Sequence, residues 1–397
     1  MNFSPEDKND LKAEASRLLS RLVACPSVNP AGRTSVASPY GEMRLDELLR
    51  SELDSLGART EIQTVAEGRT NLIARFEGLR PHPTLMFEAH GDTVQADGMS
   101  VPPFEAQIRD GRLSGRGACD AKGPMAAMLL GLRRALAGAH GRLPVPVCFV
   151  STCDEEVGAA GVRALIAGGF RVDLAVVGEP TDLAIVHVHK GALRLRIRTL
   201  GVAAHSADPS RGINAISQMR HVLEALDERL APALQRQSHP VLGPPTLSIG
   251  TIRGGSQVNV VPDECEIEVD RRLLPGEDKA RIVAGVIGEL DGIRQRRPDF
   301  SFRVEESQFY PPFESPLQSP ICQQLAEACR RTLGAELFRG AQWASNAGYL
   351  AEAGIPSVVF GPGSVHQAHT RDEFIALDQV ARAAETYAEF IRVCAES

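Results

Sequence analysis

The sequence predicts an α/β protein in which a doubly wound, largely parallel sheet carries an inserted, smaller α+β module. Apolar runs of strand length alternate with segments of helical periodicity up to Val177. The pattern changes near residue 184 to a βαββα order, and alternating strand and helix return from Ser301 onward. Such alternation is typical of parallel sheets covered by helices. We therefore expect a larger domain in two parts, residues 1–184 and 299–397, and a smaller one at residues 185–298.

The individual elements follow from the spacing of apolar residues. Leu45, Leu49 and Leu53 recur at helical spacing, whereas short apolar runs between turn residues predict strands. The polar stretch from Leu234 to His239 precedes a proline and predicts a loop inside the smaller module. Helices are expected over 11–23, 44–56, 123–136, 213–230 and 278–290, and strands over 61–65, 71–76, 84–89, 184–189, 193–200, 246–253 and 265–274.

Length and charge limit the classes of function. A chain of 397 residues exceeds what one hydrophobic core usually supports, so two or three domains are expected. Lys and Arg number 43 against 50 Asp and Glu, which gives a net charge of −7. An acidic balance argues against nucleic acid and against anionic membranes as partners. A small-molecule substrate fits this chain better.

The N-terminus and the cysteines predict a cytoplasmic protein. The segment from Met1 to Asp7 lacks the basic start and the apolar block of a signal peptide. No stretch reaches the roughly 18 uninterrupted apolar residues that a membrane helix needs. The eight cysteines show no CxxC pair or regular spacing, so we expect buried thiols rather than structural disulfides.

Four apolar stretches end in residues that can bind a metal or move a proton. His90 and Asp92 follow the first, Asp154-Glu155-Glu156 the second, Glu179 the third, and a glycine loop with His366 and His369 the fourth. In open α/β sheets, ligands bind outside the carboxyl ends of the strands. These side chains should therefore converge. Carboxylates and imidazoles with almost no thiolate suit a catalytic metal site, so the pattern favours a metallohydrolase.

Each of these groups also has an ordinary structural interpretation. The spacing of His90 and Asp92 lets the carboxylate hold the second imidazole nitrogen, but it also fits a polar turn. Asp120 lies in a glycine-rich loop before a helix, where it could bridge two cations or cap the helix. Of Glu155 and Glu156, one could bind metal while the other shuttles protons, although acidic runs are usually solvated.

The remaining histidines divide into two groups. Only one of His366 and His369 is needed as a ligand. His187 and His189 alternate on one face of a predicted strand in the inserted module, and we interpret them as structural.

The joint order of these motifs resembles the co-catalytic metallopeptidase and deacylase family that includes acetylornithine deacetylase, succinyl-diaminopimelate desuccinylase, aminoacylase and glutamate carboxypeptidase. The resemblance runs from Ser27-Val28-Asn29-Pro30 to the segment 368–373, nearly the whole chain. It implies two divalent ions, with zinc favoured and cobalt or manganese as alternatives. The implied roles are Asp120 as the bridge, His90 and Glu179 at one metal, Glu156 and His369 at the other, Asp92 orienting His90, and Glu155 as general base.

The resemblance also assigns roles outside the metal ligands. It implies that residues 185–298 form a lid and dimerisation domain, and that His205 reaches the active site of the partner subunit in a homodimer. Asn259 and Arg272 are expected to hold the substrate carboxylate, a task that suits the two parallel donors of a guanidinium. Many relatives carry an acid where this chain has Asn346, so we expect this residue to affect substrate preference.

The implied activity is hydrolysis of a linear amide by a water that the metals activate. By overall resemblance, the substrate is an N-acyl amino acid, as for acetylornithine deacetylase. A dipeptidase or carboxypeptidase with the same centre is the main alternative, and a non-catalytic binding protein that kept the fold is another. A serine or cysteine hydrolase is disfavoured because the chain has no GxSxG motif and Cys119 has no evident partner.

Overall fold

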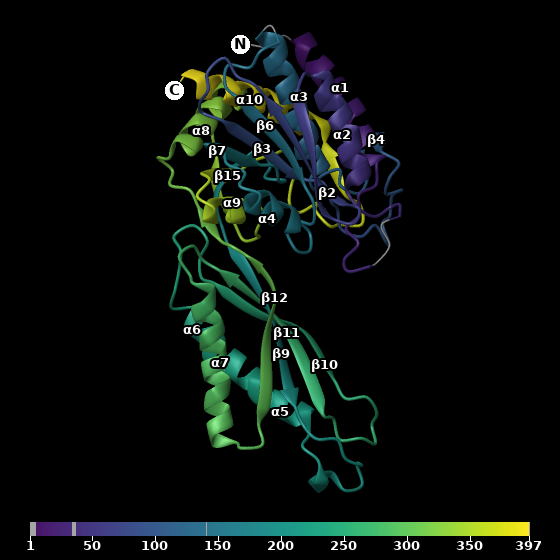
Figure 1. The fold of residues 1–397 in the computed structure, drawn as a ribbon, viewed down its shortest axis with the longest axis vertical. Helices are drawn as coiled ribbons and strands as arrows, with labels where there is room; N and C mark the ends of the chain where they lie inside the picture. Colours follow the sequence, from purple (N-terminus) through teal and green to yellow (C-terminus); the bar gives the residue numbers. More distant parts are fainter. Residues whose placement is uncertain (1–4, 34–36, 140, 397) are drawn as a thin grey trace. The chain divides into compact units, whose positions relative to one another are not determined.

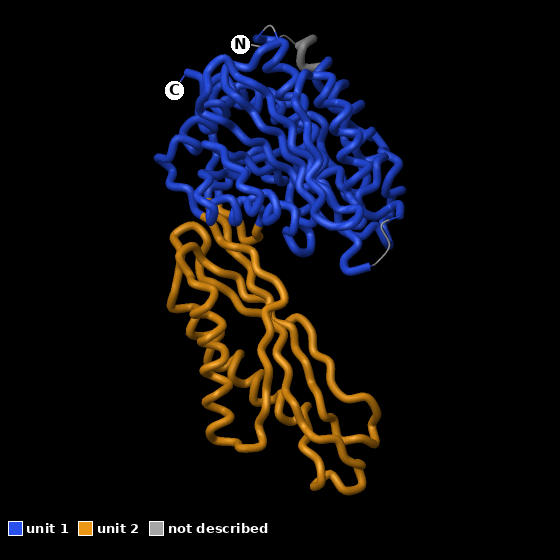
Figure 2. The backbone as a smooth tube through the Cα atoms, in the orientation of Figure 1, with its two compact units in different colours: residues 1–187, 314–339, 345–397 blue, residues 188–313, 340–344 orange. Residues whose placement is uncertain are grey.

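The chain folds into two compact units, a larger and a smaller one (Figure 2). The computed structural model describes residues 5–33, 37–139 and 141–396, so the first four residues of the N-terminal segment considered above lie outside it. Among the described residues, no helix has the length and the apolar character that a membrane crossing requires. The larger unit comprises residues 1–187, 314–339 and 345–397, and the smaller unit comprises residues 188–313 and 340–344.

The larger unit is built on a mixed sheet whose centre is parallel. Its strand order is β1-β2-β6-β3-β7-β15-β8-β13, with β14 beside β8. Strands β6, β3, β7 and β15 run parallel, whereas β1 pairs antiparallel with β2 and β2 with β6, which confirms the predicted fold class. The strands are β1 (Arg59–Ala66), β2 (Arg69–Phe76), β3 (Leu85–His90), β6 (Val147–Thr152), β7 (Leu174–Val177), β8 (Ile185–His189), β13 (Phe313–Glu314), β14 (Phe338–Ala341) and β15 (Ser357–Val359).

Helices cover both faces of this sheet (Figure 1). The apolar core on one face takes Leu45, Leu49 and Leu53 from α2 and Leu85 and Phe87 from β3. The alternate side chains of β3 face the other side, where α4 and α9 lie. The helices are α1 (Pro5–Val23), α2 (Met43–Ser55), α3 (Lys122–Gly138), α4 (Ala160–Ala167), α8 (Pro320–Leu333), α9 (Ala347–Glu352) and α10 (Leu377–Glu396), and a small separate sheet joins β16 (Phe374–Ala376), β5 (Arg112–Ser114) and β4 (Gln107–Arg109).

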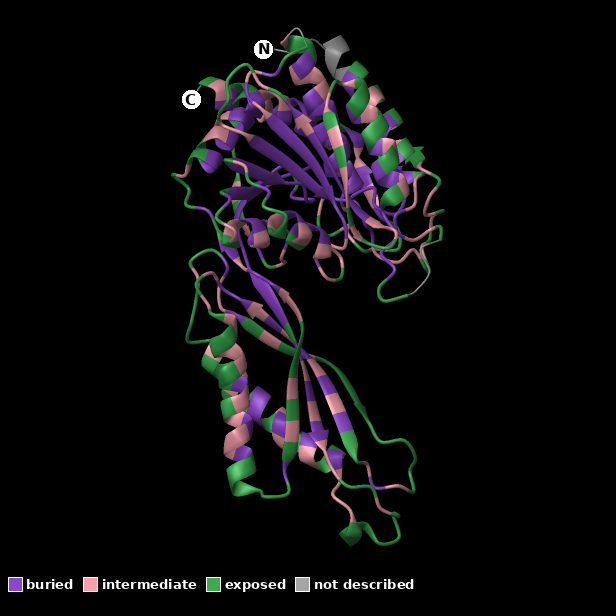
Figure 3. Ribbon diagram, viewed as in Figure 1, coloured by how far each residue is buried: buried purple, intermediate pink, exposed green. Residues whose placement is uncertain are grey.

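The smaller unit is a four-stranded antiparallel sheet with helices on one face and a core of its own. Burial alternates along its strands, whereas the central strands of the larger unit are buried throughout (Figure 3). This difference is expected when only one face of a sheet is covered. The order is β10 (Thr246–Gly254), β11 (Glu264–Leu273), β9 (Gly191–Leu200) and β12 (Ser301–Tyr310), and the helical elements are η1 (Pro209–Arg211), α5 (Ala215–Ala225), the π-helical η2 (Leu226–Leu230), α6 (Ala231–Leu234) and α7 (Lys279–Arg296).

The smaller unit extends to Phe313, beyond the end near residue 298 that the sequence pattern suggested. The reason is β12, which pairs with β9 from Ser301 opposite Leu200 to Tyr310 opposite Ala192. The residues of β12 are mostly exposed or half-buried, so the strand lacks the apolar run that marks a core strand. Its membership in the smaller unit therefore depends on pairing that the local sequence does not reveal.

Candidate metal centre

The predicted convergence of strand ends occurs in the larger unit. His90 is the last residue of β3, and Glu155 and Glu156 follow β6. Glu179 follows β7, and His369 lies in the loop after β15. These four strands are neighbours in the sheet, so their carboxyl ends open at one edge. Ligand atoms gather there in two groups within 4.8 Å, one of His90, Asp120 and Glu179 and the other of Asp120, Glu156 and His369.

Asp120 belongs to both groups and presents one oxygen to each. Its Oδ1 lies 2.9 Å from Nε2 of His90, which is also 3.9 Å from Oε1 of Glu179. Its Oδ2 lies 3.4 Å from Nε2 of His369, which is 2.9 Å from Oε2 of Glu156. A carboxylate divided in this way between two imidazoles has the arrangement of a bridge between two cations.

The loop that carries Asp120 is held by Glu373. One oxygen of the buried Glu373 carboxylate accepts hydrogen bonds from the backbone N–H groups of Cys119 at 2.8 Å and Asp120 at 3.0 Å. The other accepts from Gly117 N–H at 3.0 Å and from Arg116 at 2.7 Å. Sequence reasoning did not single out Glu373, although it closes the segment that contains His369. Its acidic side chain fixes the backbone from Gly117 up to Asp120.

Asp92 positions other residues besides His90. It contacts His90 through its backbone oxygen, not through its carboxylate as predicted. The backbone oxygen of Asp92 lies 2.9 Å from Nδ1 of His90, whereas its carboxylate is 3.6 Å away. The carboxylate instead accepts the backbone N–H groups of Glu155 at 3.0 Å and Glu156 at 3.2 Å, and the amide of Asn29 at 2.7 Å. Because the loop after β6 folds back over Asp92, this residue positions the predicted base and a predicted ligand together.

A further set of polar side chains supports the same loop. Asn29 donates to Asp92 and, at 3.0 Å, to Asp154, the residue before Glu155. Asp154 has a φ of 67°, in the left-handed region, and its carboxylate lies 3.2 Å from Arg69. Arg69 in turn makes two bonds of 2.7 Å to the buried Glu42. These contacts join segments far apart in the sequence, so sequence reasoning missed them.

The two imidazoles carry raised pKa values because carboxylates surround them. Burial alone would lower the pKa of His90, but hydrogen bonds to Asp120 and Asp92 raise it well above its usual value. Hydrogen bonds to Asp120 and Glu156 raise the pKa of His369 to about 11. Burial would raise the pKa of Asp120, yet the same two imidazoles hold it below its ordinary range. Protonated imidazoles would therefore balance part of the negative charge of the cluster.

The other carboxyl groups of the cluster are driven toward their neutral forms. Burial is the largest cause of the raised pKa values of Glu155, Glu156 and Glu179, and the charge of Asp120 adds to it. Like charges this close disfavour the ionised form of each group. A bound divalent cation would reverse that balance.

The donor set itself fits metal ions. Oε1 of Glu156 is buried and has no hydrogen-bond partner among the described residues. An orphaned buried carboxylate oxygen is unfavourable unless a ligand completes it. Imidazole nitrogen and carboxylate oxygen are the donors that zinc, cobalt and manganese accept in catalytic sites.

The other predicted residues lie elsewhere. His366 is exposed and belongs to neither group, so His369 is the imidazole that the fold selects. His187 and His189 stay structural: Nδ1 of His187 bonds to a backbone oxygen, and the ring of His189 lies 4.5 Å from that of Phe313. Burial lowers the pKa of His189 to about 3. Neither lies in a ligand group among the described residues.

Asn346 is buried beneath the site rather than exposed in a pocket. Its side chain is 1% exposed and donates to Oε1 of Glu88 at 2.9 Å and to Thr152 at 3.0 Å. Any influence of Asn346 on a substrate would therefore pass through these neighbours.

The remaining three candidates belong to the smaller unit. His205 and Asn259 are both exposed. They are neighbours because His205 forms a β-bridge with Val260 and the Ser206 N–H donates to the backbone oxygen of Asn259. Arg272 lies near the opposite end of β11. Its guanidinium donates two hydrogen bonds to the carboxylate of Asp270, at 2.8 and 3.4 Å.

Comparisons with known proteins agree with this geometry. The model of Peptidase family M20/M25/M40 matches residues 86–393. The chain is 33% identical over 374 residues to acetylornithine deacetylase of Edwardsiella ictaluri, covering 91% of this chain and 92% of that one. The corresponding protein of Vibrio parahaemolyticus is 29% identical, with 89% and 92% covered.

Solved structures share the fold across the full length. A tripeptidase from Staphylococcus aureus superposes with a TM-score of 0.78 at 23% identity, covering 97% of this chain and 99% of that one. A metallo-carboxypeptidase of the M20 family from Sulfolobus solfataricus gives 0.78 at 18% identity, with 97% and 100% covered. The chain therefore belongs to Peptidase family M20/M25/M40, and it is a metal-dependent hydrolase of amide bonds.

Asp92→Asn tests the positioning role of the Asp92 carboxylate. The amide can replace only one of the two acceptor oxygens, so one N–H of the Glu155-Glu156 segment loses its partner. The contact of His90 with the Asp92 backbone remains. We expect activity to fall about 10- to 100-fold with metal content largely kept, measured by steady-state kinetics and elemental analysis. Full activity in the variant would contradict this role.

Metal binding should release protons. Hydrogen bonds to Asp120 and Glu156 raise the pKa of His369 to about 11, so the imidazole would carry a proton near neutral pH and must lose it to become a ligand. We expect metal affinity to fall as the pH is lowered. Adding Zn²⁺ to chelator-stripped protein in weak buffer, with an indicator dye, measures the release, and His369→Gln should release fewer protons. Metal uptake without proton release would contradict the assignment.

Proposed function

We propose that the protein is an N-acyl amino acid deacylase that uses two divalent metal ions, with zinc favoured. The observation that carries this proposal is Asp120, whose two oxygens face two separate ligand groups. The likeness to acetylornithine deacetylases along about nine-tenths of the chain supports the reaction class. The products would be a carboxylate and a free amino acid.

The chain supplies ligands for both ions. His90 and Glu179 would hold one, Glu156 and His369 the other, and Asp120 both. When bound, such ions polarise the amide carbonyl and acidify the attacking water. The side chain of His369 is 53% exposed, whereas that of His90 is 1% exposed, so the His369 side of the cluster faces solvent.

Glu155 is the proposed proton carrier. It belongs to neither ligand group, yet its backbone N–H is fixed by Asp92 beside Glu156. Burial raises its pKa, the direction that a carboxylate needs to act as a base near neutral pH. In the proposed reaction Glu155 accepts a proton from the attacking water and then gives it to the nitrogen of the leaving amine.

A homodimer would complete the site. Nδ1 of His205 accepts the Ala207 N–H at 3.0 Å, so a neutral ring carries its proton on Nε2 and can donate it to a developing oxyanion. His205 and Asn259 lie at one end of β11 and Arg272 at the other, about 30 Å along a strand of ten residues. One copy of the smaller unit cannot bring all three to one substrate. Two copies can, with His205 and Asn259 supplied by the partner.

The test of the deacylase is a substrate panel on metal-loaded protein. N-acetyl and N-succinyl amino acids are compared with dipeptides of the same amino acids, and release of the free amino acid is measured with metal content determined on the same sample. The proposal requires N-acyl amino acids to be the better substrates by kcat/KM. Preference for dipeptides would replace it with a dipeptidase that has the same metal centre.

Glu155→Gln should nearly abolish hydrolysis without emptying the site. The amide is isosteric but cannot carry the proton, and such proton transfer contributes about 10² to 10⁴ in rate. Glu156→Ala is the matched comparison, because it removes a proposed ligand one residue away and should lose metal. Elemental analysis and kcat distinguish the two variants. Loss of metal from Glu155→Gln would make Glu155 a ligand instead of a base.

Subunit complementation tests the proposed role of His205. His205→Ala should lower kcat about 10²- to 10³-fold, as loss of an oxyanion donor does. In a mixed dimer with Glu155→Gln, one site combines an intact Glu155 with an intact His205. Random mixing of the two inactive variants by co-expression should therefore recover about a quarter of wild-type activity. No recovery from mixed dimers would show that His205 does not act across subunits.

A further inference from the structure

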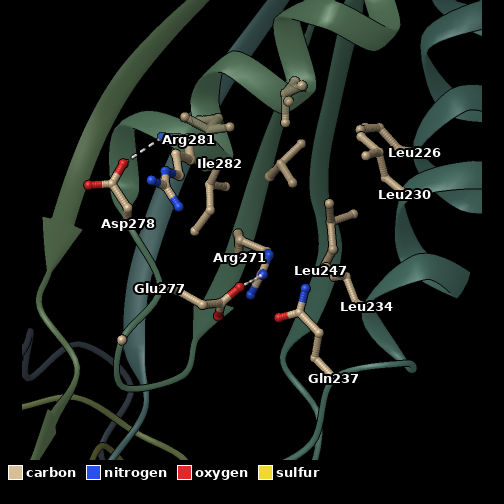
Figure 4. A pocket seen from close by; sticks show the side chains of 15 residues that line it. Leu226, Leu230, Leu234, Gln237, Leu247, Arg271, Glu277, Asp278, Arg281 and Ile282 are labelled. Atoms are coloured by element: carbon tan, nitrogen blue, oxygen red, sulfur yellow. Dashed lines mark hydrogen bonds and ion pairs between the residues drawn. The ribbon is translucent and has the colours of Figure 1, made fainter.

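The smaller unit contains a cavity of about 380 Å³ that has no part in the proposed reaction. It lies between helix α7, the segment 226–234 and the covered face of the sheet, and Figure 4 shows its lining. Its volume is within the range of about 300–1,000 Å³ that is usual for small-molecule sites.

One side of the cavity is apolar. Leu226, Leu230 and Leu234 project from the helical segment toward Leu247 of β10 (Figure 4). Leu226 is 1% exposed, whereas Leu230, Leu234 and Leu247 are half-buried. The segment changes from α-helix to a π-helical turn at 226–230, and π-helical turns are frequent at functional sites. This wall would contact an aliphatic chain.

An exposed glycine of α7 also lines the cavity. Gly285 lies within α7 and lines the cavity, and a Cβ added there would meet no atom within 4 Å. Glycine is unfavourable inside a helix, so its presence here has no local structural benefit. Gly288, one turn further along α7, has equally free space but does not line the cavity.

The charged groups at the cavity leave one cation available. Both carboxylate oxygens of Glu277 already accept hydrogen bonds, one from Arg271 at 2.5 Å and the other from the Leu274 N–H at 2.7 Å. Asp278 caps α7 by accepting the Arg281 N–H at 2.7 Å. Among the described residues, none pairs with the exposed guanidinium of Arg281. Figure 4 places Arg281 beside Ile282, across the cavity from the leucines.

We propose that this cavity binds a small aliphatic monocarboxylate, with the chain against the leucines and the carboxylate on Arg281. The cavity's two arginines and two acids sum to zero charge, so a monoanion is tolerated but a doubly charged phosphate would be repelled by Glu277 and Asp278. Arginine is well suited to such a carboxylate because its parallel donors match the two oxygens. The site is independent of the metal centre, since every lining residue belongs to the smaller unit.

Calorimetric titration of the full chain with octanoate tests the site. We expect one octanoate per chain, at least about tenfold tighter than octanol, octylammonium or butyrate, because each comparison removes the charge, inverts it or shortens the chain. Arg281→Gln, a surface change that leaves the fold intact, should weaken octanoate about tenfold and leave octanol unchanged. Octanol binding as tightly as octanoate, or octanoate binding unaffected by Arg281→Gln, would overturn the proposal.

Two glycine variants locate the binding. Gly285→Leu fills the cavity and should abolish octanoate binding, whereas Gly288→Leu, with the same change on the same helix, should leave it intact. Circular dichroism and thermal unfolding check that both variants fold. Octanoate binding retained in folded Gly285→Leu would place the ligand elsewhere, including at the metal centre, and would overturn the proposal without affecting the proposed deacylase.

Discussion

The larger unit is organised around one carboxylate that lies between two imidazoles. Asp120 can present an oxygen to each of His90 and His369 because Glu373 accepts the backbone N–H groups of Cys119 and Asp120. Glu155, Glu156 and Glu179 are then packed around a group that is already negative. Their raised pKa values express that repulsion, and cations are what would relieve it. A bound cation would thus relieve a repulsion that the fold builds into this cluster.

The gathering of the candidate ligands could be predicted because most of them follow a recognisable local pattern. His90 and Glu179 come directly after buried apolar strands, and the order of parallel strands brings such ends together. The side chains that hold the loops of the candidate ligands in place are harder to predict from the sequence. Glu373 bonds to residues more than 250 positions earlier in the chain, and Asn29 bonds to Asp92 and Asp154. No local spacing encodes contacts of that kind.

The same distinction explains the boundary of the smaller unit. Strand β11 alternates buried and half-buried residues and was expected from its sequence. Strand β12 is the edge partner of β9 and remains largely solvated, so its sequence carries a weak signal. Whether a solvated segment forms an edge strand depends on the strand that it pairs with, and its own residues carry little sign of it. The unit therefore ends where that pairing ends, fifteen residues beyond the predicted end at 298 (313 − 298).

The buried contact between Glu88 and Asn346 shows how packing in the interior can determine which residue type is favoured near an active site. Glu88 lies two residues before His90 on the face of the sheet opposite the main core, and burial raises its pKa. Thr152 and Asn346 both donate to its Oε1, at 2.6 and 2.9 Å. An acid at position 346 would bring a second carboxyl group against Glu88, and two buried like charges disfavour each other. An amide supplies the donor that Glu88 needs. The residue at position 346 is therefore explained by the strand that carries His90, without any contact to a substrate.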